Sequence, residues 1–251
     1  MGVSGEGAGL VVYYQRLLER FGPQRWWPAR TRLEVILGAI LTQNTSWNNA
    51  ARAVALLRRA GLVRLESLRH ASRAQLETCV RPAGFYRQKA ATIRNLVAWL
   101  DRDYHGSLTA LFSAPAERVR HELLGLRGIG PETADAILLY AGRKPFFVAD
   151  AYTHRMLVRH AWLRANAGYQ ATQNLLHREL PREERLFNEF HALIVKAGKQ
   201  YCLRRTPDCA PCPLRDLLPA PAPTSGAPRL SVVSNSNALE AGAPTDSMAF
   251  L

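Results

Sequence analysis

Apolar residues recur along most of this chain at the three- and four-residue spacing of amphipathic helices. The spacing predicts helices over residues 32–41, 48–60, 87–104, 116–124, 131–140 and 151–161. Ser72 and Gln75 have the spacing of a capping box, which predicts a further short helix that carries Cys79. No segment shows the sustained alternation that is typical of a strand. The chain is therefore predicted to be all-α.

The character of the chain changes at Pro213. From there to residue 251 it is rich in Pro, Ala, Ser and Gly, with little to bury, so 213–251 is predicted to be a disordered tail. The longest apolar run, 35–41, is 7 residues long, whereas a membrane helix needs about 20. The N-terminus lacks the basic and apolar regions of a secretory signal. We expect a soluble, cytoplasmic monomer.

The charge indicates the kind of partner. Lys and Arg number 33 and Asp and Glu number 20, which gives a net charge of +13. Only 4 of the basic residues are lysines, so 29 are arginines, whose planar fork suits phosphate. An excess of this size favours a polyanion, and nucleic acid is the commonest one. An arginine-rich but merely solvated surface is the alternative.

Two glycines separate a pair of predicted helices. Gly128 and Gly130 flank Ile129, and Pro131 follows in the first turn of the second helix, where proline is tolerated. Such a turn allows a phosphate to approach the backbone N–H groups and the helix N-terminus closely. Many helical hairpins use glycine only to turn. The basic composition favours a hairpin that binds the DNA backbone.

Asp150 follows an apolar run and precedes a predicted helix. An Asp at this place is usually an N-cap, and the helix dipole favours its ionised form. The residue types alone do not distinguish a cap from a catalytic carboxylate.

Together these motifs resemble a known family. Gly128-Ile129-Gly130, then Gly142 and Pro145, then Asp150 are similar to the helix-hairpin-helix, Gly/Pro loop and aspartate signature of the endonuclease III superfamily of DNA glycosylases. The likeness covers residues 26–212. It implies two all-helical lobes with DNA and a flipped base between them, and it makes Asp150 the essential carboxylate. That carboxylate would stabilise an oxocarbenium-like sugar and orient the attacking water.

The resemblance also implies the domain order. We expect an N-terminal segment that joins the C-terminal lobe, a six-helix lobe with the hairpin, a C-terminal lobe with a cysteine loop, and the tail. Their expected bounds are 1–33, 34–141, 142–212 and 213–251.

Glu132 stands where bifunctional members of the family carry a lysine, two residues after the second hairpin glycine. That lysine forms a Schiff base with the sugar, which a carboxylate cannot do. The resemblance therefore implies a monofunctional glycosylase that uses water. The alternative is another amine that reaches the site in space, and the nearest lysines along the chain are Lys89 and Lys144.

The chain resembles one branch of the superfamily more than the others. The branch of 3-methyladenine DNA glycosylase III is indicated by the sequences GIGPETADAIL, CVRPAGFYRQKA and LTQNTSW. It implies a base pocket that includes Trp26, Trp27 and Trp47, whose ring faces attract a cationic alkylated purine, as Glu132 would. Core packing is the alternative for these tryptophans. Oxidised-pyrimidine repair with lyase activity is the alternative for the substrate.

Other residues match the positions that open the duplex in this family. Gln43 corresponds to the polar residue that fills the gap, and Phe85 to a wedge, for which core packing is the alternative. Arg87 and Lys89 are expected to reach neighbouring phosphates. The hairpin residues expected to contact DNA are Gly128, Ile129, Gly130 and Thr133. The expected partner is double-stranded DNA that contains a damaged base, at the nucleoid of a bacterial-type cell.

A cysteine cluster has the spacing C-x6-C-x2-C. Its members are Cys202, Cys209 and Cys212. Family members with a fourth cysteine after five intervening residues hold a [4Fe–4S] cluster, but Leu218 occupies that position here and cannot bind iron. The alternatives are an oxygen ligand from Asp216, a three-iron cluster, or no cluster. Cys79 is interpreted as a buried structural thiol.

We therefore predict a DNA repair glycosylase that removes an alkylated purine such as 3-methyladenine, without lyase activity. A protein that only binds DNA through its hairpin is the alternative from a different functional class. Asp150 at the expected place argues against it.

Overall fold

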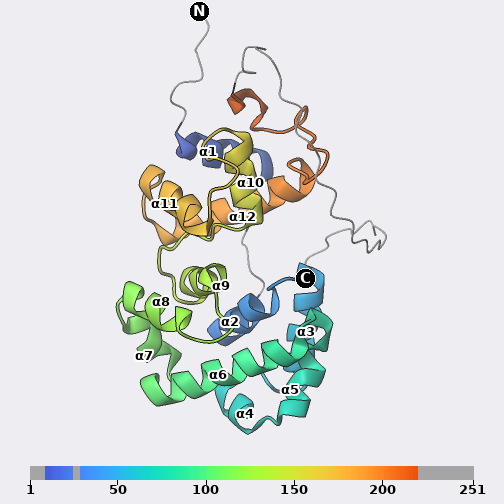
Figure 1. Ribbon diagram of the computed structural model, residues 1–251, viewed down its shortest axis with the longest axis vertical. Helices are drawn as coiled ribbons and strands as arrows, with labels where there is room; N and C mark the ends of the chain where they lie inside the picture. The colour runs from blue at the N-terminus through green and yellow to red at the C-terminus, as the bar shows by residue number, and fades with distance from the viewer. Residues whose placement is uncertain (1–8, 25–28, 220–251) are drawn as a thin grey trace, which may run out of the picture. The chain divides into compact units, whose positions relative to one another are not determined.

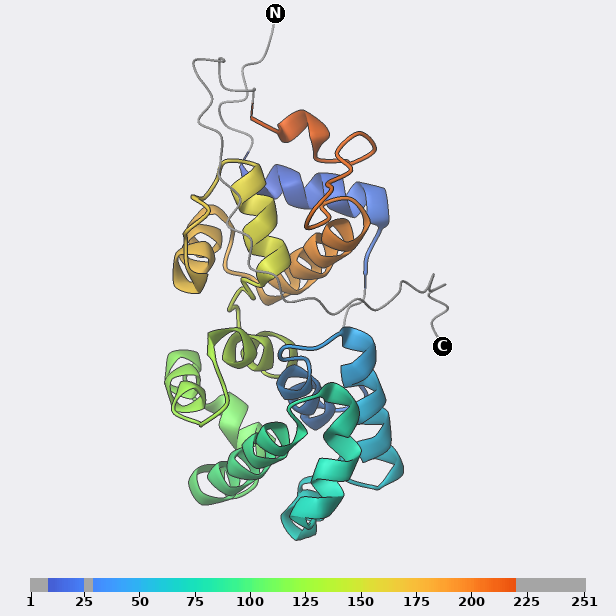
Figure 2. The same cartoon turned by 45° about the vertical axis from the view of Figure 1, so that its right-hand side comes forward.

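The computed structural model describes residues 9–24 and 29–219. Over these residues the chain forms helices and connecting loops without any strand, so the all-α prediction is confirmed there. Figures 1 and 2 show the helices from two sides. No helix among the described residues is long and apolar enough to cross a membrane.

One group of helices packs around α2 (Arg32–Leu41), which contacts α3 (Trp47–Arg59), α6 (Tyr86–Tyr104) and α9 (Pro131–Ala136). Residues 33–41 of α2 are all buried, as is typical of a central helix that is apolar on every side. The rest of this group consists of α4 (Leu65–His70), α5 (Arg73–Val80), η1 (Arg81–Ala83), α7 (Leu108–Ser113) and α8 (Ala116–Leu124). The capping box is confirmed, because Ser72 and Gln75 make both of its hydrogen bonds at the start of α5.

A second group consists of α1 (Leu10–Phe21), α10 (Ala151–Arg159), α11 (Tyr169–Glu179) and α12 (Glu184–Gln200). α12 contacts both α1 and α10, and α11 contacts the same two helices. The N-terminal helix therefore packs with helices from the C-terminal part of the chain. Phe147, just before α10, meets Phe187 and Phe190 of α12 edge to face, with ring centroids 5.2 and 6.0 Å away.

The helix expected over 131–140 changes its form part-way. α9 ends at Ala136, and a π-helical turn, η2 (Ile137–Ala141), follows. The N–H of Gly142 donates to the carbonyl of Ile137, five residues earlier, at 3.0 Å. This wider turn contacts both α2 and α12, so it lies where the two groups of helices meet.

The boundary predicted at Pro213 is wrong for residues 213–219. Leu214 is 2% exposed, and η3 (Arg215–Leu217) follows it. The hydroxyl of Tyr13 in α1 donates to the carbonyl of Leu217 at 3.2 Å, so this segment is held against the N-terminal helix. Composition could not reveal this contact because it joins residues 204 positions apart in the sequence. The rest of the predicted tail, 220–251, lies outside the described residues.

Candidate active site

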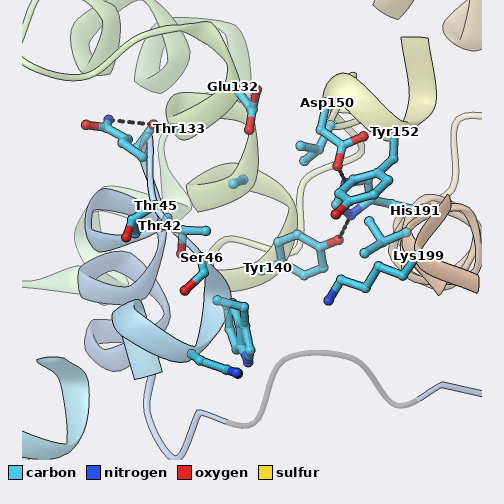
Figure 3. A pocket seen from close by; sticks show the side chains of 17 residues that line it. Thr42, Thr45, Ser46, Glu132, Thr133, Tyr140, Asp150, Tyr152, His191 and Lys199 are labelled. Atoms are coloured by element: carbon cyan, nitrogen blue, oxygen red, sulfur yellow. Dashed lines mark hydrogen bonds and ion pairs between the residues drawn. The ribbon is translucent and has the colours of Figure 1, made fainter. Parts of the chain in front are cut away.

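A cavity of about 370 Å³ lies where the hairpin, the loop after α2 and helices α10 and α12 meet (Figure 3). Its walls bring together residues that are far apart in the sequence. Among them are Gln43, Trp47, Glu132, Tyr140, Asp150 and His191. The two predicted carboxylates, Glu132 and Asp150, therefore share one cavity.

Asp150 is the N-cap of α10, as predicted. Its Oδ1 accepts a hydrogen bond from the N–H of Thr153 at 2.8 Å, and its Oδ2 lies 3.4 Å from Nε2 of His191. Burial alone would raise the pKa of Asp150, but His191 and the N–H of Thr153 outweigh burial and lower it below the usual value. The carboxylate is therefore ionised at neutral pH.

His191 and Tyr140 continue this contact along the cavity wall. The hydroxyl of Tyr140 hydrogen-bonds Nδ1 of His191, whose other nitrogen faces Asp150 (Figure 3). Burial, with the charge of Asp150, raises the pKa of Tyr140 well above its usual value, so the phenol keeps its proton at neutral pH. The sequence analysis missed both residues.

Glu132 lies in the first turn of α9 and lines the same cavity. The surrounding protein and the charge of Asp150 both raise the pKa of Glu132. The two carboxyl groups therefore have pKa values that are shifted in opposite directions. The pKa of Asp150 lies below its ordinary value, and the pKa of Glu132 lies above its ordinary value.

An amine also lines this cavity. Lys199, in the last turn of α12, is 67 residues from Glu132 in the sequence and reaches the cavity from another wall. Burial lowers the pKa of Lys199, while Asp150 acts in the opposite direction. The sequence analysis considered only lysines near the hairpin along the chain, so it did not find this one.

Aromatic side chains form part of the wall. Trp47, the first residue of α3, lines the cavity, as do Tyr140 and Tyr152. Trp26 and Trp27, which the resemblance also placed at the base, lie outside the described residues. Of the three predicted tryptophans, the structure thus places Trp47 at the cavity.

The glycine turn brings the backbone close to the side chain of Thr92. Gly128 has a φ of 94°, and a Cβ there would lie 2.1 Å from the hydroxyl oxygen of Thr92. Ile129 is buried between the helices, whereas Gly130 is the N-cap of α9. Glycine at position 128 is therefore required both by backbone angle and by space.

The two residues predicted to open the duplex lie on separate loops. Gln43 follows α2, and its Nε2 donates to the carbonyl of Gly128 at 2.9 Å and to Oγ1 of Thr133 at 2.7 Å. Phe85 precedes α6 and is 61% exposed, with a left-handed φ of 45°. An exposed aromatic ring excludes the alternative that Phe85 is core. Arg87 is exposed beside it.

Lys89 does not reach the surface, so the phosphate contact predicted for it is wrong in this structure. Its side chain is 3% exposed, and its Nζ donates to the carbonyls of Leu41 at 2.9 Å and Ala83 at 2.7 Å. These backbone groups, rather than an anion, satisfy the ammonium.

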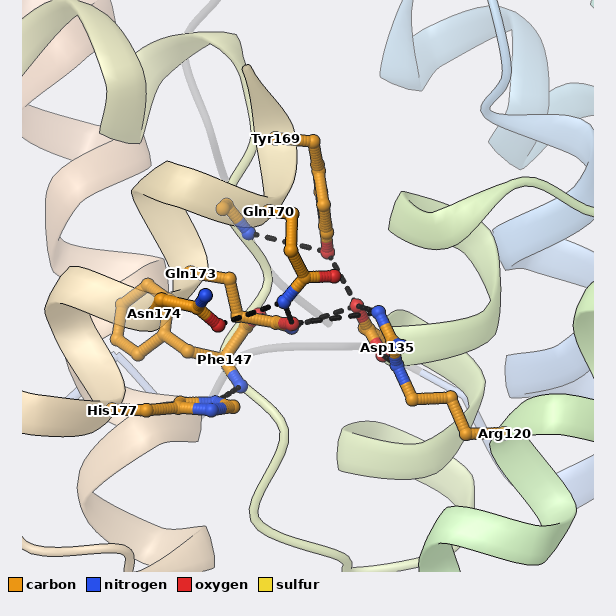
Figure 4. A network of polar contacts seen from close by, with 9 residues as sticks. Arg120, Asp135, Phe147, Tyr169, Gln170, Gln173, Asn174 and His177 are labelled. Carbon is orange, nitrogen blue, oxygen red and sulfur yellow. Dashed lines mark hydrogen bonds and ion pairs between the residues drawn. The ribbon is translucent and has the colours of Figure 1, made fainter. Parts of the chain in front are cut away.

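The loop that leads to Asp150 is fixed by a second polar network (Figure 4). Asp135 of α9 is fully buried, is paired with Arg120 at 2.6 Å, and accepts from the hydroxyl of Tyr169 at 2.8 Å and from Nε2 of Gln173 at 2.7 Å. Gln173 also donates to the carbonyl of Phe147 at 2.7 Å.

The same helix, α11, holds the loop at two further points. The N–H of Phe147 donates to Nε2 of His177 at 3.0 Å, and burial lowers the pKa of His177 to about 4, so the ring is a neutral acceptor. The N–H of Ala149 donates to the hydroxyl of Tyr169 at 3.5 Å. The backbone immediately before Asp150 is therefore tied to α11, and through Asp135 to α9.

The three clustered cysteines line a second, small cavity with Leu218 in its wall. Cys202 accepts a hydrogen bond from Arg159 at 3.0 Å, and Asp216, the alternative oxygen ligand, is paired with Arg16 at 3.5 Å. Within 9–24 and 29–219, no three His, Cys or acidic side chains are placed to hold a metal ion. The residues here do not fit a [4Fe–4S] cluster held by four cysteines. Cys79 is half-buried, and burial raises the pKa of its thiol.

The arrangement of hairpin, Gly/Pro loop and aspartate matches a known family model. The model of the HhH-GPD superfamily of base excision DNA repair proteins matches residues 37–182. The chain belongs to this superfamily. Among its relatives, a protein of Methanocaldococcus jannaschii named as a DNA repair glycosylase, MJ1434, is 39% identical over 81% of this chain and 92% of its own length. Endonuclease III-like protein 1 of Bos taurus is 31% identical over 77% of this chain, which spans 60% of that relative.

Solved structures of HhH-GPD enzymes share the fold. A 3-methyladenine DNA glycosylase of H. pylori, bound to 1,N6-ethenoadenine, is 28% identical with a TM-score of 0.66, over 77% of this chain and 96% of that one. An endonuclease III trapped in a covalent complex with DNA has a TM-score of 0.71 at 22% identity, over 82% of this chain and 93% of that one. The resemblance and the all-helical class are thus confirmed for this HhH-GPD protein.

Proposed function

We propose that this protein hydrolyses the N-glycosidic bond of a flipped, alkylated purine such as 3-methyladenine in double-stranded DNA, without lyase activity. The proposal depends on one observation above all: the ionised Asp150 faces a cavity in which Glu132, not a lysine, occupies the first turn after the hairpin. We further propose that it acts as a monomer on chromosomal DNA in the cytoplasm.

The chemistry follows from the two oxygens of Asp150. As the base leaves with the bonding electrons, positive charge develops on the sugar, and a fixed carboxylate stabilises that charge. Water then bonds to the anomeric carbon and loses its proton toward Asp150. The N–H of Thr153 and the imidazole of His191 hold the carboxylate in place, so that it need not reorganise during the reaction.

The cavity wall favours a cationic base. An alkylated purine carries a positive charge, which is attracted by the face of Trp47 and by Glu132. Such a base is already a good leaving group, so little acid catalysis is required. Lys199 opposes this attraction when protonated, but burial lowers the pKa of that amine.

Lys199 also supports a second candidate function. An amine in the cavity with Asp150 is the group that a bifunctional glycosylase needs for a Schiff base with the sugar. A bifunctional enzyme of the endonuclease III type that acts on oxidised pyrimidines is therefore the alternative, with Lys199 in place of the lysine that position 132 lacks.

The test uses end-labelled duplexes that contain one 3-methyladenine, one oxidised pyrimidine or one abasic site. Each is incubated with the wild type, with Asp150→Asn and with Lys199→Gln, and the products are separated with and without hot alkali. The matched control is Asp216→Asn, since Asp216 is a surface residue outside the cavity. We expect the alkylated duplex to break only after alkali, with at least a hundredfold loss in Asp150→Asn and none in the control.

Two other results would contradict the proposal. Breaks without alkali, together with a protein–DNA adduct that borohydride traps by reducing the imine, would establish the lyase alternative if Lys199→Gln abolishes both. Tight binding to damaged duplexes with no turnover by the wild type on any of them would favour a protein that only binds DNA.

A further inference from the structure

The buried ammonium of Lys89 lies at the junction of two loops. It bonds the carbonyl of Leu41, the last residue of α2, and the carbonyl of Ala83, the last residue of η1. The carbonyls at the end of a helix have no partner within the helix, and the helix dipole favours a positive charge beside them. Lys89 thus caps two helix ends that come from different parts of the chain.

A lysine is a costly choice for this position. Its neighbours in α6 toward the core, Ala90 and Ile93, are apolar, and burial lowers the pKa of Lys89 to about 8. A buried ammonium destabilises a protein unless its hydrogen bonds are satisfied. An apolar side chain would avoid that cost but would leave two carbonyls unpaired. The position therefore uses the cation to join two backbone segments.

Both segments lead directly to the residues proposed to open the duplex. Gln43 comes two residues after Leu41, and Phe85 comes two residues after Ala83. The amide of Gln43 and the ring of Phe85 line, together with Lys89, one hollow of about 600 Å³. The cation therefore lies between the points where the two loops begin. Its two hydrogen bonds fix the distance between these points.

We propose that Lys89 is a positioning residue that holds the Gln43 loop and the Phe85 loop at the spacing needed to enter the DNA together. This proposal rests on the proposed function, because it assumes that both loops insert when a base is flipped. It assigns the ammonium a role in opening the duplex, and none in the chemistry on the sugar.

The experiment separates opening from chemistry. Lys89→Met removes the cation and keeps the length of the side chain, Lys89→Arg keeps the cation, and Lys196→Met is a control lysine on α12, outside the hollow. Excision of 3-methyladenine is measured from a matched duplex and from a single strand, where no duplex has to be opened. We expect Lys89→Met to lower kcat/KM on the duplex by about tenfold to a hundredfold, to leave the single strand within about twofold, and Lys89→Arg to restore most of the loss.

A readout without catalysis keeps the two proposals distinguishable. A 2-aminopurine beside a stable abasic analogue brightens when the duplex is opened, whether or not any base is excised. We expect Lys89→Met to reduce this signal while the wild type and Lys196→Met retain it. A wild type that opens the duplex but excises nothing would contradict the proposed function only.

Other outcomes would overturn the role of Lys89. An equal loss on duplex and single strand would indicate general damage to the fold, and no loss on either would indicate that the cation is dispensable. If Lys89→Met does not fold, a double-mutant cycle of Gln43→Ala and Phe85→Ala in the native background replaces it. Joint insertion predicts that the two losses are not additive, whereas additive losses would refute it.

Discussion

The two oxygens of Asp150 have different neighbours, so under the proposed function one side chain serves both the helix cap and the chemistry. Oδ1 caps α10 through the N–H of Thr153, while Oδ2 faces His191 at the cavity. An Asn at this position keeps an oxygen for the cap and loses the charge. Asp150→Asn is therefore expected to abolish turnover without unfolding α10, which makes it a sharper probe than Ala.

His191 is expected to set the acid limit of activity. Because His191 opposes the effect of burial and lowers the pKa of Asp150, its replacement by Gln should raise that pKa. Since the proposed reaction requires the ionised carboxylate, the rate should then be lost at a higher pH as the pH falls. Single-turnover excision measured across acid and neutral pH tests this, with the exposed His70→Gln as control. If the excision rate of His191→Gln falls at the same acid pH as that of the wild type, His191 does not set the acid limit.

Residues whose role depends on local sequence could be predicted, and those that depend on distant pairing could not. The cap at Asp150 and the turn at Gly128 follow from their immediate neighbours. His191 and Lys199 reach the cavity only because α12 packs against α10, which no spacing reveals. Lys89 did carry a signal that was overlooked: it lies four residues before Ile93, on the buried stripe of α6.

At the scale of elements, α11 acts as a brace for the loop before Asp150. Tyr169 accepts from the N–H of Ala149 and donates to Asp135, so it connects that loop to the hairpin helix. Tyr169→Phe removes both hydrogen bonds and keeps the ring. We expect it to lower the free energy of unfolding by about 1–2 kcal/mol and to lower kcat more than it raises KM, because Asp150 loses its fixed position.

Urea unfolding and steady-state excision together check this expectation. Arg178→Ala is the matched control, since its pair with Glu179 is exposed on the same helix and should change stability by no more than about 0.5 kcal/mol. A Tyr169→Phe enzyme with lowered stability and unchanged kcat would mean that the network supports the fold alone.

The sequence analysis gave residue ranges for part of the helices, and no range for α1, α4, α7, α11 and α12. α2, α3, α6, α8 and α10 occur within a few residues of the expected bounds because each carries an apolar stripe. The continuation of α9 was predicted as regular helix, since a π turn and an α turn have almost the same local composition. The segment 213–219 was predicted as tail because its contacts, such as the hydrogen bond from Tyr13 to the carbonyl of Leu217, are made with residues far away in the sequence.

For the whole molecule, the excess of positive charge predicts how DNA binding depends on salt. Each phosphate that an arginine neutralises releases counterions. The logarithm of the association constant should therefore fall linearly with the logarithm of the salt concentration. For a protein that contacts about six phosphates, the loss between about 50 and about 200 mM salt should be roughly a thousandfold.

Fluorescence anisotropy of a labelled, undamaged duplex measures this slope. Arg87→Gln, which removes an exposed arginine beside Phe85, should reduce the slope by about 0.9, whereas Lys89→Met should leave it unchanged, because that ammonium is buried. An equal change in both variants would mean that Lys89 reaches a phosphate after all.

The π turn at Ile137–Ala141 makes the site sensitive to the number of residues in this segment rather than to which residues they are. A turn closed over five residues holds one residue more than a regular turn, so every residue after it is rotated about the helix axis relative to an uninterrupted α-helix. Tyr140 reaches His191 from within this turn. Loss of a single codon in this stretch would restore the regular helix and turn the phenol away from His191, even if every remaining side chain were unchanged. The register of this turn therefore decides whether Tyr140, His191 and Asp150 can contact one another in sequence.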